Sequence, residues 1–394
     1  MGAARRPSPH LLLAVLLVSL LLNCLLLLLR PYLGSRALLL PSFRPRWVPL
    51  AGPPLGDPGR GEAGAGAPGG GAWLPHLCPR PPGHWRGVLG TSSGVLRRLS
   101  WTPPRNDTIF FLQTSCAAAF TAREACAVES AARHHPRRPV QVFLTSPVTN
   151  TSHPLLQVVE RAANVHLSWL DLEQVFSAPP LRRWHQARSW MTASTGYNVA
   201  VMVSDAARLE LLRRFGGTYL DLDSLTLRPL PAHDNYLARL SDRLISNGVM
   251  SFQPAHPLIQ KMVADIPNTW NGMSYTSIGA DLLTRHLHLL CPRALAIPPL
   301  PPPAHPETCG DVTVFPGDLF FPFINGTDLK KIFMVERGYG PEFTESSQGY
   351  ALHLYNHLTS KAAVSVSRES VLRDVAVRQC PGVVEMLAQR DPFL

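Results

Sequence analysis

The sequence predicts an α/β domain with a mostly parallel central sheet, preceded by a transmembrane helix and a disordered stem. Three observations predict this. An apolar run lies near the N-terminus, a long Pro- and Gly-rich stretch follows it, and from residue 106 onward short apolar runs alternate with helix-like segments. Strands that alternate with helices favour a parallel sheet, because the chain must cross over between parallel neighbours and usually does so through a helix.

The membrane anchor is predicted at residues 11–29, where only three residues interrupt the apolar pattern. A run of that length spans the hydrocarbon core of a bilayer as a helix. A cleaved signal peptide is the alternative, but its apolar region is normally shorter and ends in small residues. Arg30-Pro31-Tyr32 follows here, which is a poor cleavage site. We therefore expect a retained anchor, with residues 1–10 as a cytoplasmic tail.

Residues 30–105 are expected to form the stem, because such Pro- and Gly-rich sequence buries too little apolar surface to offset the entropy lost on ordering. Residues 1–105 contain twelve arginines, no lysine and two acidic residues, and so account for the whole net charge of +10. The remaining residues hold 25 basic and 25 acidic side chains. A folded domain without net charge lacks the electrostatic footprint of a nucleic-acid-binding protein.

The cysteines and glycosylation sequons indicate a secretory compartment. Cys24 lies in the anchor, and the six other cysteines form no C-x-x-C pair, which argues against a zinc site and is compatible with disulfides. Sequons begin at Asn106, Asn150 and Asn325. Arginines flank both ends of the anchor, so charge alone leaves its orientation open. The sequons and cysteines require a luminal C-terminal part, which predicts a single-pass type II protein.

The folded part is expected to begin near Asn106. Predicted strands are 109–112, 140–144 and 165–170, and predicted helices are 118–135, ended by Pro136, then 184–203 and 205–215. Ligands of such sheets bind at the carboxyl ends of the strands. Gln113-Thr114-Ser115 and Asp221-Leu222-Asp223 fall at such ends.

The stretch from Arg213 to Asp223 is the centre of the predicted site. Gly216 and Gly217 can take the positive φ that ends a helix and turns the chain tightly. Tyr219-Leu220 then reads as a short buried strand, which Asp221 and Asp223 follow. Two carboxylates at i and i+2 on a strand end can both reach one Mg²⁺ or Mn²⁺ ion. Taken alone, an Asp-x-Asp is more often a solvated loop end.

The surrounding residues change that balance. Phe215 to Asp223, preceded by Ser204-Asp205-Ala206-Ala207-Arg208, resembles the Asp-x-Asp glycosyltransferases that use nucleotide sugars. More narrowly it resembles the α-1,4-glycosyltransferase family, typified by lactosylceramide 4-α-galactosyltransferase and α-1,4-N-acetylglucosaminyltransferase. Further motifs follow the family's order: Gln113-Thr114-Ser115, with Gln for the usual Glu; Ser246 to Phe252; Leu282 to Arg285; and Ala351 to Asn356, with Tyr355 for the usual Trp. The resemblance covers roughly residues 106–390.

The resemblance implies a GT-A-like nucleotide-sugar transferase domain over residues 106–394, with the Asp-x-Asp part at 106–290 and a C-terminal part at 291–394. It implies retaining transfer of a hexose from UDP-galactose or UDP-N-acetylglucosamine, galactose being favoured, to a galactose-terminated glycolipid or glycan. Mn²⁺ or Mg²⁺ is the implied cofactor and the Golgi membrane the implied location. Two other possibilities remain: a glycan-binding protein without turnover, and a structural Golgi protein with a vestigial Asp-x-Asp.

The resemblance also assigns residues. The metal ligands are Asp221, Asp223 and His353; the nucleotide and sugar contacts are Gln113, Thr114, Ser115, Asp205, Arg208, Tyr219, Asn247 and Gly248; and Asp223 is catalytic. Asp281 is a second catalytic candidate, which follows from a departure from the family described below. Each assignment has a structural alternative. Asp205 and Arg208 can form an ion pair on a helix face, Asn247-Gly248 can form a β-turn, and His353, between two leucines, can be a core residue.

One departure from the family concerns the sugar site. The family pattern Trp-Gly-x-Gln-Gly-Pro before Leu-Leu-Thr-Arg is replaced here by Tyr275-Thr-Ser-Ile-Gly-Ala280, so Ile278 stands where the Gln is expected. Isoleucine has no lone pair with which to face a sugar ring. Either Asp281 contributes to the sugar site, with Ser277 a weaker substitute, or turnover is slow. The alternative for Asp281 is a helix-start residue favoured by the helix dipole.

Overall fold

The computed structural model describes residues 96–187, 196–241, 243–292, 305–323, 329–335, 338–390 and 393–394. The predicted tail, anchor and nearly all of the stem lie outside these residues, as does the sequon at Asn325. Within the described ranges, no helix combines the length and the apolar character that crossing a bilayer requires. All described residues belong to the compact unit Gly70–Leu394.

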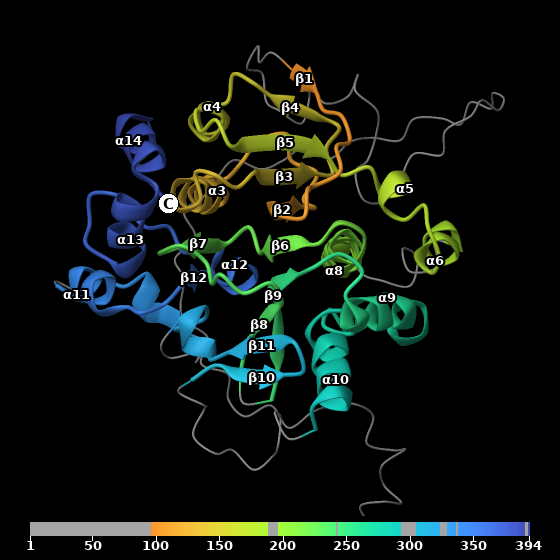
Figure 1. Ribbon diagram of the computed structural model, residues 1–394. Coiled ribbons are helices and arrows are strands. Elements are labelled where there is room, and N and C mark those ends of the chain that lie inside the picture. Colours follow the sequence, from red (N-terminus) through yellow and green to blue (C-terminus); the bar gives the residue numbers. More distant parts are fainter. Residues whose placement is uncertain are drawn as a thin grey trace, which may run out of the picture. The chain divides into compact units, whose positions relative to one another are not determined.

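The centre of this unit is an eight-stranded sheet in the order β10-β11-β8-β9-β6-β2-β3-β5 (Figure 1). Its strands are β2 (Ile109–Gln113), β3 (Val140–Leu144), β5 (Val165–Trp169), β6 (Gly217–Leu220), β8 (Tyr236–Arg239), β9 (Ile245–Phe252), β10 (Glu307–Cys309) and β11 (Val312–Phe315). The three predicted strands match β2, β3 and β5 to within one residue. The α/β class is therefore confirmed.

The sheet is mixed, so the expectation of a mostly parallel sheet holds for one half only. β6, β2, β3 and β5 run parallel to one another, and β11 is parallel to β8. β9 runs antiparallel to both β8 and β6, and β10 runs antiparallel to β11. β8 and β9 are joined by a short connection, and such a connection joins only antiparallel strands. Apolar periodicity alone does not reveal strand direction.

Two further pairs of strands extend the structure. β1 (Leu96–Arg98) pairs with β4 (Val148–Asn150), and β7 (Ser224–Thr226) pairs with β12 (Ala351–His353), both antiparallel. β7 follows Asp223 directly, so the β7–β12 pair links the Asp-x-Asp corner to a segment more than one hundred residues later in the chain.

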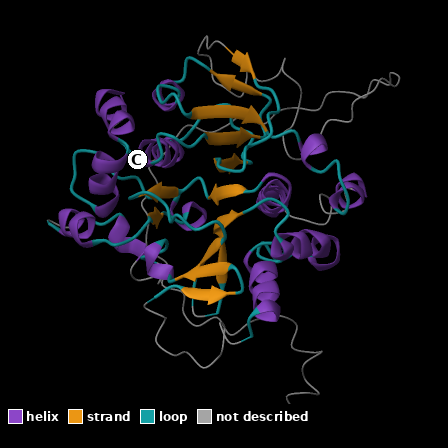
Figure 2. Ribbon diagram, viewed as in Figure 1, coloured by secondary structure: helices purple, strands orange, loops and turns teal. Residues whose placement is uncertain are grey.

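Helices lie on both sides of the sheet (Figure 2). One side carries α3 (Ala122–His134), α4 (Pro154–Val159), α13 (Val371–Gln379) and α14 (Pro381–Arg390), and the other carries α5 (Leu172–Val175), α6 (Leu181–Ala187), α8 (Gly196–Phe215), α9 (Pro257–Thr269) and α10 (Ala280–Leu290). The short elements are α11 (Tyr339–Ser346), α12 (Asn356–Thr359), η2 (Gly317–Leu319) and η3 (Leu329–Ile332). Alternate residues of β2 face opposite sides: Ile109 and Phe111 pack toward α3, Phe110 and Leu112 toward α8.

Two helix predictions need correction. The helix expected at 118–135 begins at Ala122, because the Thr121 side chain caps it and Glu124 closes a capping box. The separate helices expected at 184–203 and 205–215 are divided differently: α6 ends at Ala187, and α8 runs without a break from Gly196 through Asp205 to Phe215. Asp205 is therefore a mid-helix residue.

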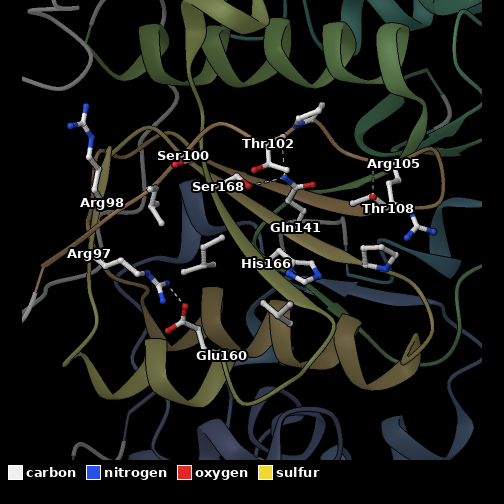
Figure 3. Close-up of a pocket in the computed structure, with 15 residues that line it drawn as sticks. Arg97, Arg98, Ser100, Thr102, Arg105, Thr108, Gln141, Glu160, His166 and Ser168 are labelled. Carbon is white, nitrogen blue, oxygen red and sulfur yellow. Dashed lines mark hydrogen bonds and ion pairs between the residues drawn. The ribbon is translucent and has the colours of Figure 1, made fainter.

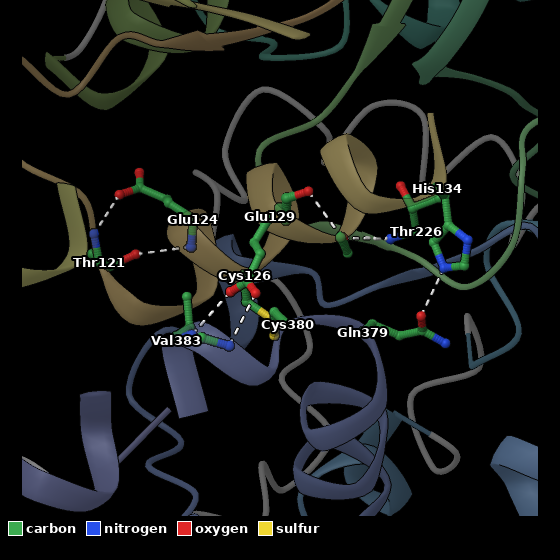
Figure 4. The surroundings of a disulfide bond; sticks show 12 residues. Thr121, Glu124, Cys126, Glu129, His134, Thr226, Gln379, Cys380 and Val383 are labelled. Atoms are coloured by element: carbon green, nitrogen blue, oxygen red, sulfur yellow. Dashed lines mark hydrogen bonds between the residues drawn. A yellow bond between two sulfur atoms is a disulfide. The ribbon is translucent and has the colours of Figure 1, made fainter. Parts of the chain in front are cut away.

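A disulfide bond links the C-terminal helices α13 and α14 to α3. Cys126 of α3 is bonded to Cys380, between α13 and α14, across 254 residues of sequence (Figure 4). Next to this bond, the Glu129 carboxylate accepts the backbone N–H groups of Gly382 and Val383, each at 2.9 Å. Glu129 thereby satisfies N–H groups at the start of α14 that have no partner within the helix. Cys291 is bonded to Cys309, and Cys116 is also disulfide-bonded.

Candidate active site

The acidic corner begins with the two predicted glycine turns. Gly216 has φ 69° and Gly217 has φ 101°, both in the left-handed region. A Cβ on Gly216 would lie 2.8 Å from the Phe252 carbonyl oxygen, and one on Gly217 would lie 2.7 Å from the Thr108 carbonyl oxygen. Only glycine fits both demands, so the end of α8 can pack tightly against the sheet before β6 delivers Asp221.

His353 joins the two aspartates, as the family resemblance implied. Opposite Ser224 in the β7–β12 pair, it comes directly beside the acidic corner. Its Nε2 lies 3.4 Å from Asp221 Oδ2 and 3.2 Å from Asp223 Oδ1. Among the residues that the structure describes, Asp221, Asp223 and His353 form the one cluster with metal-ligand geometry, their ligand atoms all within 4.8 Å of one another. His353 is thus buried against carboxylates and is not a purely apolar core residue.

The donor set fits a hard divalent cation. Burial disfavours the His353 imidazolium, but the Asp223 and Asp221 carboxylates outweigh this effect and raise the pKa of His353 to about 10. Such a shift reports a local excess of negative charge, which a cation can neutralise. The Asp221 and Asp223 side chains remain 27% and 14% exposed, so the cluster opens to solvent. The second oxygen of Asp223 accepts the Asn356 N–H at 2.7 Å, which fixes that carboxylate.

Arg208 connects the helix α8 to the acidic corner. Its guanidinium lies 3.2 Å from Asp205 Oδ1 and 3.0 Å from Asp221 Oδ1, and it donates to the Asn247 carbonyl at 2.9 Å. It also stacks over the Tyr219 ring at 4.2 Å from the centroid. The helix-face ion pair between Asp205 and Arg208 therefore exists, but it is buried and bridges to Asp221. A planar fork with several donors is suited to holding two carboxylates.

The two carboxylates that Arg208 joins differ in their surroundings. Burial raises the pKa of Asp205 to about 6, against the opposing charge of Arg208. Burial also acts on Asp221, but Arg208, His353 and the Tyr219 hydroxyl hold the pKa of Asp221 below its usual range. The Tyr219 hydroxyl donates to Asp221 Oδ1 at 2.6 Å. The Asp221 carboxylate is therefore held in place from two sides, by Arg208 and Tyr219.

Asn247 and Gly248 lie inside strand β9, so the β-turn alternative is wrong. The Asn247 side chain donates to Asp205 Oδ1 at 2.8 Å, and the Asp221 N–H donates to the Gly248 carbonyl at 2.8 Å. A Cβ on Gly248 would come within 2.4 Å of Asp221 Oδ2. A Cβ on Gly279 would come within 2.5 Å of Asp205 Oδ2. Both glycines leave room for a carboxylate of the site.

Gln113 is the last residue of β2, and Thr114 and Ser115 follow it. The hydrogen bonds that the Gln113 amide donates go to residues outside the cluster of Asp221, Asp223 and His353. Gln113 is buried, and its amide donates to the Ala119 carbonyl at 3.1 Å and to Glu124 at 3.2 Å. Its Oε1 accepts no hydrogen bond from any residue that the structure describes. Thr114 is half-buried and Ser115 exposed. Gln113 therefore hydrogen-bonds to the start of α3, while Thr114 and Ser115 remain accessible at the strand end.

The segment before α10 contains Ile278, the residue that departs from the family pattern. Ile278 is fully buried in the apolar core beneath α9 and α10. The Ser277 hydroxyl accepts the Asn271 N–H at 3.0 Å. The Asp281 carboxylate accepts the Thr276 hydroxyl at 2.5 Å within the first turn of α10. Gly279 is the residue of this segment that touches the polar cluster.

Sequence reasoning missed Arg123. It is a buried residue of α3 that donates to Asn356 Oδ1 at 3.0 Å and to the Thr359 carbonyl at 3.0 Å. Arg123 thereby fixes the loop whose Asn356 N–H holds Asp223. These partners are 233 and 236 residues away in sequence, and no local motif connects them.

Apart from the acidic corner, the structure contains a pocket of about 610 Å³ at the starts of β3 and β5 (Figure 3). There Arg97 pairs with Glu160, and the Gln141 amide donates to the Thr102 carbonyl and to the Ser168 hydroxyl, both at 2.8 Å. These particular polar groups are therefore paired with one another. The pocket lies at the ends of the strands opposite to those that carry the acidic corner.

Comparison with known proteins agrees with this geometry. Residues 251–387 match the family model described as the alpha 1,4-glycosyltransferase conserved region, and residues 121–243 match the glycosyltransferase sugar-binding region containing the DXD motif. Human lactosylceramide 4-alpha-galactosyltransferase is 30% identical over 297 residues, which cover 73% of this chain and 80% of that protein. Human alpha-1,4-N-acetylglucosaminyltransferase is 28% identical over 282 residues, 69% of this chain and 78% of that protein.

Among solved structures, the galactosyltransferase LgtC in complex with donor and acceptor sugar analogues is similar at 16% identity. The match covers 63% of this chain and 87% of LgtC, with a TM-score of 0.32. A score of that size is too low to identify a fold, and the sequence matches carry the assignment.

Proposed function

This chain belongs to the α-1,4-glycosyltransferase family, and from that premise we propose that it is a metal-dependent, retaining hexosyltransferase. Its proposed donor is a UDP-sugar, UDP-galactose in preference to UDP-N-acetylglucosamine. Its proposed acceptor is a galactose-terminated glycolipid or glycan. Human lactosylceramide 4-alpha-galactosyltransferase, 30% identical to this chain over 80% of its own length, transfers galactose by its name, which supports galactose as the transferred sugar.

The observation that carries the proposal is the cluster of Asp221, Asp223 and His353 at the carboxyl end of β6. Mn²⁺ or Mg²⁺ held by these three residues would offset the negative charge that develops on the departing diphosphate. The chain itself holds the ligands in position: Arg208 and Tyr219 fix Asp221, and the Asn356 N–H fixes Asp223. Ligands held in this way need no rearrangement when charge develops.

The nucleotide and sugar contacts are proposed around the same corner. Asp205 and Asn247 are hydrogen-bonded to each other. The backbone of Gly248 lies close to the Asp221 carboxylate, and that of Gly279 lies close to the Asp205 carboxylate. We assign Asp205, Arg208, Tyr219, Asn247 and Gly248 to the donor side of the site, with Gln113, Thr114 and Ser115 at the neighbouring strand end. Asp281 has two candidate roles, a sugar-site contact and a helix-start residue, and its hydrogen bond from the Thr276 hydroxyl favours the second.

The proposed setting is the Golgi membrane, with residues 11–29 as a type II anchor and residues 106–394 in the lumen. The disulfides Cys126–Cys380 and Cys291–Cys309 support an oxidising compartment.

Donor screening of the purified full-length chain tests the proposal. UDP release is measured with UDP-galactose and UDP-N-acetylglucosamine, each with Mn²⁺ and a panel of galactose-terminated acceptors, and the product linkage is read by NMR. We expect an α-1,4 product from UDP-galactose that disappears with chelator. Asp223→Asn should reduce the rate by more than the roughly 10–100-fold that loss of an outer-shell partner costs.

Other results would revise the proposal. A product from UDP-N-acetylglucosamine alone would change the donor, and full activity in chelator would exclude the metal role. Acceptor binding without UDP release would indicate a glycan-binding protein. If the protein shows neither acceptor binding nor UDP release, a structural role is the one that remains.

A further inference from the structure

A series of aromatic rings leads from the acidic cluster to the protein surface. The His353 ring centroid lies 4.5 Å from that of Tyr355, which lies 6.5 Å from that of His357. The His357 centroid is in turn 6.5 Å from that of Tyr275. His357 is exposed and Tyr275 is 52% exposed, so the series ends in an accessible pair of rings.

The two outer rings come from two segments, α12 and the loop before α10, that contact different flanks of the site. His357 follows Asn356, whose N–H donates to Asp223 at 2.7 Å. The loop that carries Tyr275 ends at Gly279, which lies against the Asp205 carboxylate. The contact between Tyr275 and His357 therefore joins the metal flank to the Asp205 flank of the site.

The same two segments expose apolar side chains. Met273 is 82% exposed and Leu358 is 68% exposed, beside Tyr275 and His357 respectively. Apolar side chains that gather at the mouth of a polar site and are left uncovered are typical of ligand-binding surfaces. Neither side chain belongs to the two apolar clusters of the described core.

We propose that Tyr275 and His357 form the acceptor subsite, on which the terminal pyranose of the acceptor lies with its C–H face against the rings. This inference rests on the proposed transferase function and names where its second substrate binds. A pyranose has one face rich in C–H bonds, and the electron-rich face of an aromatic ring attracts such weakly positive hydrogens. A sugar on this pair lies at the outer end of the ring series from His353, so its hydroxyl edge can face the acidic cluster.

The test separates acceptor binding from donor binding in the full-length protein. Tyr275→Ala and His357→Ala are compared with Tyr275→Phe, which keeps the ring. The control is Leu289→Ala. This side chain is 72% exposed and lies on α10, outside both α12 and the loop before α10. Acceptor KM is measured with a soluble lactoside and with a lipid-linked lactoside, and donor KM and acceptor-independent UDP release are measured in parallel.

Loss of either ring should raise the KM for both acceptors on the order of tenfold, which corresponds to about 1.4 kcal/mol. Donor KM, acceptor-independent UDP release and thermal midpoint should stay near wild type. Tyr275→Phe and Leu289→Ala should match wild type in all of them.

Three results would overturn the inference. The first is an unchanged acceptor KM in Tyr275→Ala. The second is a donor KM that rises as much as the acceptor KM. The third is a rise in KM for the lipid-linked acceptor alone, which would indicate a contact with the lipid. Each requires a wild-type protein that turns over its donor. A wild-type protein without any donor turnover would instead refute the proposed function.

Discussion

Gly248 and Asp221 face each other across the β6–β9 pair so closely that a Cβ at position 248 would lie 2.4 Å from Asp221 Oδ2. The same pair shares a backbone hydrogen bond of 2.8 Å from the Asp221 N–H to the Gly248 carbonyl. The backbone of Gly248 is therefore fixed, and an added side chain can be accommodated only if the carboxylate moves.

The first prediction concerns this contact. Gly248→Ala should displace the Asp221 carboxylate from His353 and Arg208, and so weaken Mn²⁺ binding and slow transfer by roughly 10–100-fold, as changes in the support of a metal ligand do. Metal affinity is measured from the Mn²⁺ dependence of the rate. Gly349→Ala is the control, because its Cβ would meet no atom nearer than 3.2 Å. Equal Mn²⁺ dependence in both variants would exclude Asp221 as a ligand.

The second prediction concerns Arg208. Arg208→Met leaves the buried Asp205 carboxylate without its counter-charge, which should lower the free energy of unfolding by about 3–5 kcal/mol. Denaturant unfolding of the metal-free protein measures it. In Arg285→Met the lost pair with Asp265 is partly exposed, the Arg285 side chain being 44% accessible, so the expected cost is only about 0–1 kcal/mol. If the free energy of unfolding falls by a similar amount in the two variants, the buried ion pairs of Arg208 contribute no more to stability than the exposed pair of Arg285.

The third prediction concerns the segment before α10. Ile278→Gln restores the residue that the family pattern contains, but it buries an amide in an apolar core, and we expect a loss of roughly 1–3 kcal/mol in stability with no gain in rate. Asp281→Asn should cost about 0.3–1 kcal/mol through the helix start and leave transfer unchanged. A tenfold slower transfer in Asp281→Asn, with the fold intact, would assign Asp281 to the sugar site.

The fourth prediction concerns pH. His135 Nε2 accepts the Leu230 N–H at 2.9 Å, so the proton lies on Nδ1, which donates to the Ala131 carbonyl at 3.0 Å. Burial lowers the pKa of His135 from 6.5 to about 4. The unfolded chain therefore binds this proton first, and stability that is complete above pH 6.5 is lost as the pH falls toward 4.

Unfolding measured between pH 7 and pH 4 checks this, with His135→Gln as the comparison. The variant should be less stable at neutral pH but should lose less stability on acidification. Parallel curves for the two proteins would show that His135 does not contribute to the acid sensitivity.

The fifth prediction concerns glycosylation. Asn106 is exposed in the turn before β2, whereas Asn150 is 7% exposed in β4 and accepts the Ser152 N–H at 3.0 Å. A glycan on Asn150 would conflict with this packing. We expect Asn106→Gln to remove one glycosidase-sensitive mobility shift from the expressed chain and Asn150→Gln to remove none. The reverse result would contradict the placement of β4, and an unglycosylated chain would contradict the luminal orientation.

The sequence by itself determined the acidic corner and its approach. Gly216 and Gly217 predict a helix end and tight turn, and Tyr219-Leu220 predicts the buried strand that presents Asp221 and Asp223. These are short-range features, set by backbone freedom and by apolar runs, and the structure contains them. The strands β2 and β3 were predictable for the same reason.

Tertiary structure decided which distant residues complete the site. His353 reaches Asp221 through the β7–β12 register, Arg208 reaches it because α8 packs against β6, and Arg123 reaches Asn356 across 233 residues. The direction of β9 and the contact between Tyr275 and His357 are of the same kind. Each depends on how separate segments pack against one sheet, a balance of many small contact energies that no local pattern of residues records.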